Sequence, residues 1–162
     1  MRGATLIGGT GAPPVGPVDV VIEDNIIGDV KSVGYPGLAI DEDRRPTDAT
    51  HEIDAHGQYV MPGIIDMHTH TGGSTKAPEA EYTYKLWMGH GITTVRGVPS
   101  SNVPFSLSER ARSEGNEIFA PRIFSYHPPG SGEAWSDRNI LTADDAREWV
   151  QYLARQGADG LK

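Results

Sequence analysis

The fold of this chain is decided by the stretch PGIIDMHTH at residues 62–70. A Pro-Gly pair precedes a largely apolar run, and glycines at 72–73 end the pattern, which predicts a short buried strand. Side chains in a strand alternate with a period of two, so His68 and His70 are expected to face the same way while Thr69 faces the other way. Two imidazoles on one face predict a metal site.

Taken alone, a pair of histidines two residues apart is weak evidence, because a chance surface pair is the commoner explanation. The position of the pair strengthens the metal interpretation, since α/β barrels place their chemistry at the carboxyl ends of strands. Imidazole ligands suit zinc, iron, nickel and copper. Asp66, on the same face as the histidines, is expected either to orient a ligand histidine or to hold the end of the strand.

The organisation of the chain changes near Val60. Before it, apolar runs at 19–23 and 26–30 flank the turn-forming pair Asp24-Asn25, which predicts a β-hairpin. The residues from 34 to 50 are rich in Gly, Pro and Asp, which indicates a surface loop. The first sixty or so residues are therefore expected to form a small β-rich region.

After Val60 the pattern alternates between strands and helices. Helices are expected from about 80 to 90, from 107 to 114 and after Thr142, with strands at 92–95 and from Ile123 onward. In the last helix, Thr142 and Asp145 form a capping-box pattern, the apolar side chains recur at helical spacing, and Gly157 marks the end; those apolar residues are Ala146, Trp149, Val150 and Leu153. Such alternation predicts a parallel sheet.

These motifs together resemble the amidohydrolase superfamily, the metal-dependent hydrolases that include dihydroorotase, imidazolonepropionase and several dipeptidases. Residues 53–70 are similar to the entry into the barrel of that family, and GITTVR at 91–96 is similar to its second strand. APRI at 120–123 resembles the third strand, and GADGLK at 157–162 resembles the fourth. The resemblance touches almost the whole chain.

The resemblance implies an α/β fold with two parts. Residues 1–60 would be the β-rich portion of a small composite β-sandwich domain. Residues 61–162 would supply the first four strands, and so the first half, of a TIM (β/α)₈ barrel, which typically needs about 250 residues.

In many members of this family the lysine that ends the fourth strand is carbamylated and bridges two metal ions. The resemblance therefore implies that His68, His70 and Lys162 hold one or two divalent ions, with Zn²⁺ expected. Without the family pattern, Lys162 would be interpreted as a solvated charge. A lysine reacts with carbon dioxide only when neutral, so burial and neighbouring charge must lower its pKa.

The resemblance implies hydrolysis of an amide, cyclic amide or related C–N bond through a metal-activated water. The family's catalytic aspartate and its later histidine ligands have no counterpart in this sequence, so the chain by itself is expected to contain no catalytic residue and to be inactive. A phosphotriesterase-like activity, a deaminase activity and a non-catalytic structural role stay open as alternatives. Retention of both His68 and His70 argues against the last.

Two further histidines follow predicted elements. His127 comes after the third barrel strand and opens a loop rich in Pro and Gly, where either substrate contact or an incidental place in a rigid turn is open. His90 lies at the end of a predicted helix, where it is expected to cap backbone carbonyls.

Composition limits the remaining classes. The formal net charge of −8 argues against nucleic acid as a partner, so a small-molecule substrate is expected. There is no cysteine for a disulfide or a thiolate metal site. No stretch is long and apolar enough for a membrane span, and residues 1–9 are too glycine-rich for a signal peptide. A cytoplasmic location is expected; an export signal or domain missing from this chain, and a homo-oligomer, both stay open.

Overall fold

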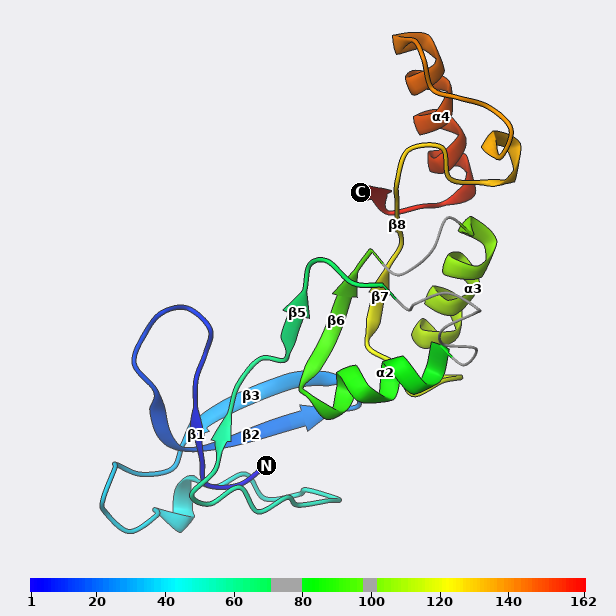
Figure 1. Ribbon diagram of the computed structural model, residues 1–162. Helices are drawn as coiled ribbons and strands as arrows, with labels where there is room; N and C mark the ends of the chain where they lie inside the picture. Colours follow the sequence, from blue (N-terminus) through cyan, green and yellow to red (C-terminus); the bar gives the residue numbers. More distant parts are fainter. Residues whose placement is uncertain (71–79, 98–101) are drawn as a thin grey trace. The chain divides into compact units, whose positions relative to one another are not determined.

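The structure is a computed structural model that describes residues 1–70, 80–97 and 102–162 (Figure 1). These residues form two compact units, Met1–Pro62 and Gly63–Lys162. The sequence predicts a boundary close to this division. No helix among the described residues has the length and apolar character needed to cross a membrane.

The first unit is built on a four-stranded sheet. The order of its strands is β3 (Ile26–Ser32), β2 (Val15–Glu23), β1 (Ala4–Leu6) and β4 (Tyr59–Val60). The predicted hairpin is confirmed: β2 and β3 pair antiparallel up to Glu23 and Ile26, and Asp24 adopts a φ of 55° in the turn between them.

A small apolar core supports this sheet. Its buried side chains are those of Ala4, Val18, Val20 and Ala55. The predicted loop at 34–50 runs mostly exposed and contains one short 3₁₀ helix, η1 (Glu42–Arg44). The first unit therefore matches the β-rich region expected before Val60.

The second unit contains two short parallel sheets that follow one another along the chain. The first has the order β5 (Ile64–Asp66), β6 (Ile92–Arg96) and β7 (Arg122–Phe124), and the second pairs β8 (Tyr126–His127) with β9 (Gly160–Leu161). Only Ser125 separates β7 from β8, so one extended segment pairs first with β6 and then with β9 (Figure 1). The predicted parallel pairing is confirmed.

Helices connect these parallel strands. Helix α2 (Ala80–Gly89) precedes β6, α3 (Val103–Glu114) precedes β7, and the 3₁₀ helix η2 (Glu133–Trp135) and α4 (Ala143–Gln156) lie between β8 and β9. Helix α3 begins earlier than the predicted Leu107, because the Asn102 side chain accepts a hydrogen bond from Phe105 N at 3.0 Å and Pro104 suits the first turn.

Two apolar clusters hold the helices of this unit. Tyr84 of α2 packs with Val95 and Ile123 of the sheet. The second cluster joins α3, η2 and α4 through Val103, Trp135, Trp149 and Leu153.

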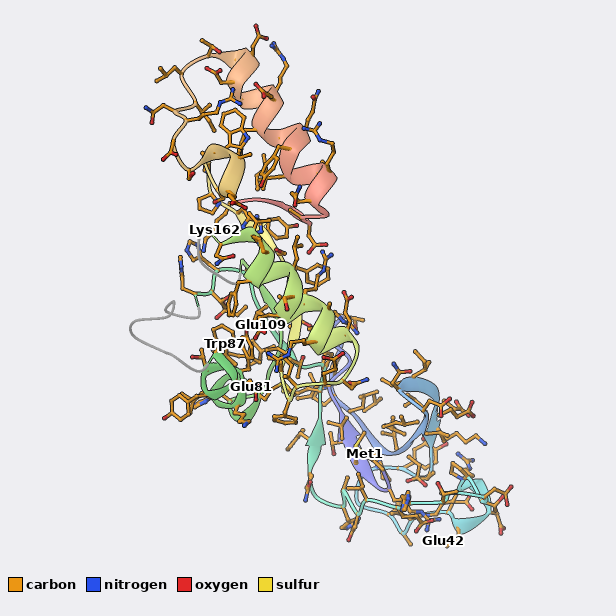
Figure 2. The ribbon with its side chains drawn as sticks, turned by 90° about the vertical axis from the view of Figure 1, so that its right-hand side faces the viewer. Met1, Glu42, Glu81, Trp87, Glu109 and Lys162 are labelled. Carbon is orange, nitrogen blue, oxygen red and sulfur yellow. The ribbon has the colours of Figure 1, made fainter. Side chains whose placement is uncertain are left out.

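An ionic link also joins two of the helices. The Arg112 guanidinium of α3 donates to Glu109 on its own helix at 2.6 Å and to Glu81 of α2 at 2.8 Å. Figure 2 labels both carboxylates.

Helix α4 shows the predicted ends. Thr142 Oγ1 accepts from Asp145 N at 3.1 Å, Asp145 Oδ2 accepts from Thr142 N at 2.9 Å, and Gly157 ends the helix with a φ of 88°. The predicted apolar stripe is only partly right: Trp149 and Leu153 are buried, whereas Val150 is 40% exposed. Val150 follows Trp149 by one residue, or about 100° of rotation, which takes it to the edge of the packed face.

We expect Thr142→Ala to destabilise α4 by about 1 kcal/mol, because the backbone N–H of Asp145 loses its acceptor. Amide hydrogen exchange in the first turn of α4 should accelerate, which mass spectrometry of peptides from that turn would measure. The matched control is Thr50→Ala, at an exposed loop position of the first unit. Unchanged exchange in Thr142→Ala would show that the capping box contributes nothing measurable.

A pH effect should accompany this cap. Hydrogen bonds from Thr142 and Leu141 lower the pKa of Asp145 from its ordinary value of 3.8. Because the folded-state pKa is the lower one, the stabilisation is fully present above the unfolded pKa and is lost as the pH falls through the folded pKa. The difference in melting temperature between the wild type and Asp145→Asn should therefore shrink as the pH falls below about 4. The exposed Asp137, changed to Asn, is the control.

Candidate functional site

His68 and His70 lie just beyond the end of β5. The strand ends at Asp66, whose Oδ1 accepts a hydrogen bond from His68 N at 3.0 Å, so Asp66 holds the strand end. The strand is thus shorter than the sequence pattern suggests. Thr69 N still donates to Arg96 O at 3.2 Å, which continues the contact with β6. Thr69 is buried and both histidines are exposed, in keeping with the predicted alternation.

The two imidazole rings converge on one point. Their Nε2 atoms lie 3.3 Å apart, and the ring planes are tilted by 43°. A tetrahedral zinc ion with Zn–N bonds of about 2.0–2.1 Å places two ligand nitrogens roughly 3.3 Å from each other. The separation of the Nε2 atoms therefore fits two ligands of one such ion.

Lys162 reaches the same point from the end of β9. Its Nζ lies 2.9 Å from His70 Nε2 and donates to Thr69 O at 3.3 Å. Its backbone N–H donates to His127 O at 2.9 Å, which continues the pairing of β9 with β8. Three nitrogen side chains thus meet at the carboxyl ends of β5 and β9, and the stick view labels Lys162 among them (Figure 2).

The surroundings favour the neutral forms of two of these groups. Burial lowers the pKa of His70, and the charges of Lys162 and His68 lower it further. Burial also lowers the pKa of Lys162, with a second contribution from Arg96. A neutral imidazole has a lone pair that can coordinate a metal ion, and a neutral amine has a lone pair that can attack carbon dioxide.

Arg96 is the residue near the site that sequence reasoning missed. It ends β6, its guanidinium carbon lies 4.2 Å from the centre of the Tyr126 ring, and its NH2 donates to Leu161 O at 3.5 Å. The available signal was its position as a charged residue directly after the apolar run of β6. Arg96 links the ends of β6, β8 and β9 and supplies the cation that acts on Lys162.

His127 is enclosed rather than open. Its side chain has 0% exposure, its Nε2 lies 2.8 Å from Ser125 Oγ, and burial lowers its pKa. The described structure therefore places this ring in a buried network of hydrogen-bonded side chains. Substrate contact at His127 stays a prediction. His90 behaves as predicted: its Nδ1 lies 2.7 Å from Leu86 O at the end of α2.

The three candidate ligands that meet here are fewer than the four that a zinc ion takes. Within residues 1–70, 80–97 and 102–162, no three or more His, Asp or Glu side chains come together as a metal-binding group. The described residues bring together two imidazoles, those of His68 and His70, and one amine, that of Lys162.

Comparison with known proteins gives a consistent picture. No family model matches the chain. It is 33% identical over 121 residues to an adenine deaminase of Methanoculleus marisnigri, which covers 69% of this chain and 21% of that protein. It is 27% identical over 148 residues to a D-hydantoinase of Streptomyces coelicolor, covering 86% of this chain and 30% of the relative. A dihydroorotase of Halalkalibacterium halodurans is 32% identical over 114 residues, covering 67% and 24% respectively.

Solved structures agree. A Xaa-Pro dipeptidase with bound methionine matches 98% of this chain with a TM-score of 0.71 and 25% identity, and the match covers 45% of that protein. The chain thus spans less than half of the solved relative and a third or less of the curated ones. Similarity to an adenine deaminase, a D-hydantoinase and a dihydroorotase in sequence, and to a dipeptidase in structure, supports the amidohydrolase superfamily as the family of this chain.

Proposed function

We propose that the protein containing this chain is a metal-dependent hydrolase that cleaves amide, cyclic amide or related C–N bonds. The observation that carries the proposal is the convergence of His68, His70 and Lys162 at the carboxyl ends of β5 and β9. Relatives named D-hydantoinase, dihydroorotase and Xaa-Pro dipeptidase support the same class of reaction and a small-molecule substrate.

The architecture proposed for the complete protein is a TIM barrel with a small β-sandwich. In the second unit, β5, β6, the β7–β8 segment and β9 are neighbours in chain order and run parallel. This is the order of the first four strands of a (β/α)₈ barrel. The antiparallel sheet of the first unit would be part of the β-sandwich.

His68 and His70 would hold a divalent ion, with zinc the proposed metal because the spacing of their nitrogens fits its tetrahedral geometry. When bound, the ion would lower the pKa of a coordinated water and polarise the scissile carbonyl. The protein's own part is to hold the two imidazoles convergent and to favour the neutral form of His70. Asp66 contributes by fixing the backbone of His68 through its side chain.

Lys162 would complete the ligand set as a carbamate. Its neutral amine would attack carbon dioxide, forming a new N–C bond and releasing the amine proton to solvent, so that two carboxylate-like oxygens replace one nitrogen. The lowered pKa of Lys162 supports this step, because it raises the fraction of neutral amine. Two oxygens can serve two ions, so a binuclear centre is proposed.

A deaminase is the second candidate. The adenine deaminase of Methanoculleus marisnigri is among the relatives, and further adenine deaminases are 36–42% identical to shorter parts of this chain. Release of ammonia from adenine, compared with hydrolysis of a hydantoin, dihydroorotate and an Xaa-Pro dipeptide, would separate the two candidates. Absence of all four activities in metal-loaded complete protein would favour a non-catalytic relative.

We expect His68→Ala and His70→Ala, each in the complete protein, to remove most of the bound metal and most of the activity. Each variant deletes one of two nitrogens that share an ion. Elemental analysis of the purified protein measures the metal, and His90→Ala is the control, since His90 caps α2. Full metal occupancy in the double variant would place the metal site elsewhere.

Lys162→Ala should leave at most one tightly held ion, because the bridging oxygens are lost while His68 and His70 remain. A short carboxylic acid added to the buffer should restore part of the activity by supplying those oxygens. Lys85→Ala, at an exposed lysine of α2, is the matched control. An unchanged metal content in Lys162→Ala would argue for a mononuclear centre.

A further inference from the structure

Lys162 directly follows β9, a strand of only two residues, Gly160 and Leu161. Within the described residues β9 pairs with the equally short β8, so few ladder hydrogen bonds hold it. Within this pairing Asp159 N donates to Ser125 O at 2.9 Å and Lys162 N donates to His127 O at 2.9 Å. Something else must fix β9 if Lys162 Nζ is to stay near His70.

The Asp159 carboxylate supplies that connection. Its Oδ2 accepts from Ser125 N at 2.7 Å and from the Arg110 guanidinium of α3 at 2.8 Å. Arg110 NH1 also donates to Gly157 O at 2.9 Å, at the end of α4. Both charged side chains are partly buried, with exposures of 23% for Arg110 and 28% for Asp159. One carboxylate thus ties the residue before β9 to the neighbouring strand and to a helix.

Ser125, which Asp159 contacts, is itself held by buried polar groups. Ser125 Oγ lies 2.6 Å from Ser106 Oγ of α3 and 2.8 Å from His127 Nε2. All three side chains are buried. This gives the enclosed His127 a role within the protein, since its ring and its backbone carbonyl contact Ser125 and Lys162 respectively.

The close approach of β9 to β8 also restricts position 160. A Cβ placed on Gly160 would overlap the Tyr126 ring, so a side chain there would push the strands apart. With the Tyr126 ring in its present position, the spacing leaves no room for a Cβ at position 160.

We propose that Asp159, supported by Arg110, is a positioning residue that sets the place of Lys162 at the site. It acts through the register of β9 and touches neither His68 nor His70 in the described structure. The inference rests on the proposed function only in treating Lys162 as a ligand. The proposal adds the salt bridge between Asp159 and Arg110, which lies outside the candidate ligand set and acts on metal binding through the position of Lys162.

The test is a pair of measurements on Asp159→Ala in the complete protein. Amide exchange at Lys162, whose N–H is bonded to His127 O, should accelerate about tenfold or more, because an unconstrained β9 opens more often. Zinc titration should show a roughly ten- to hundredfold weaker second ion, the size usual when a group that orients a ligand is removed.

A double-mutant cycle with Lys162→Ala separates positioning from general destabilisation. If Asp159 acts through Lys162, Asp159→Ala should weaken binding of the second ion when Lys162 is present and should not weaken binding of the remaining ion once Lys162 is alanine. An equal loss in both backgrounds, or unchanged exchange at Lys162, would overturn the inference. Asp159→Asn keeps an acceptor for Ser125 N and should fall between the wild type and Asp159→Ala.

Controls keep the outcomes distinct. Glu148→Ala removes an exposed ion pair with Arg138 in the same unit and should alter neither measurement. If Asp159→Ala does not fold, Asp159→Asn and Arg110→Gln enter the same cycle. If Lys162→Ala itself leaves metal binding unchanged, the binuclear function fails, whereas faster exchange at Lys162 in Asp159→Ala would still support the positioning role.

Discussion

The parallel pairing of β8 with β9 is the contact on which the candidate site depends. It brings Lys162 within 2.9 Å of His70, although the two residues are 92 positions apart in sequence. Parallel strands place their carboxyl ends at one edge, so residues that follow different strands can share one site. The end of β5 alone places the two histidines. The position of Lys162 beside them depends on the pairing of every strand from β5 to β9.

Local sequence signals predicted several features of the fold and of the candidate site. The Asp24-Asn25 hairpin, the capping box at Thr142 and Asp145, the stop at Gly157 and the alternation of His68, Thr69 and His70 depend on neighbours within a few residues. The pairing of Asp159 with Arg110 and the burial of His127 could not be predicted in this way. Asp159 contacts Arg110 and Ser125, which are 49 and 34 positions away in sequence, and these contacts exist only after the strands have paired.

The electrostatics of the site follow from what surrounds it. Burial lowers the pKa of both His70 and Lys162, and Arg96 adds a positive charge near the amine. Among the described residues, an unmodified lysine lies beside two histidines and near an arginine, so positive charge gathers around the amine. The negative charge of a carbamate on Lys162 would therefore be stabilised there.

Side chains of helix α3 hold the segments next to the short strands β8 and β9 in place. Ser106 and Arg110 are four residues apart and so lie on the same face of this helix. From that face Ser106 contacts Ser125, between β7 and β8, while Arg110 contacts Asp159 before β9. One rigid helix thus fixes the two segments that must stay in register for Lys162 to reach His70. Asn102 begins this helix as its N-cap, so a local capping interaction helps to hold the helix that contacts the segment before Lys162, the candidate ligand.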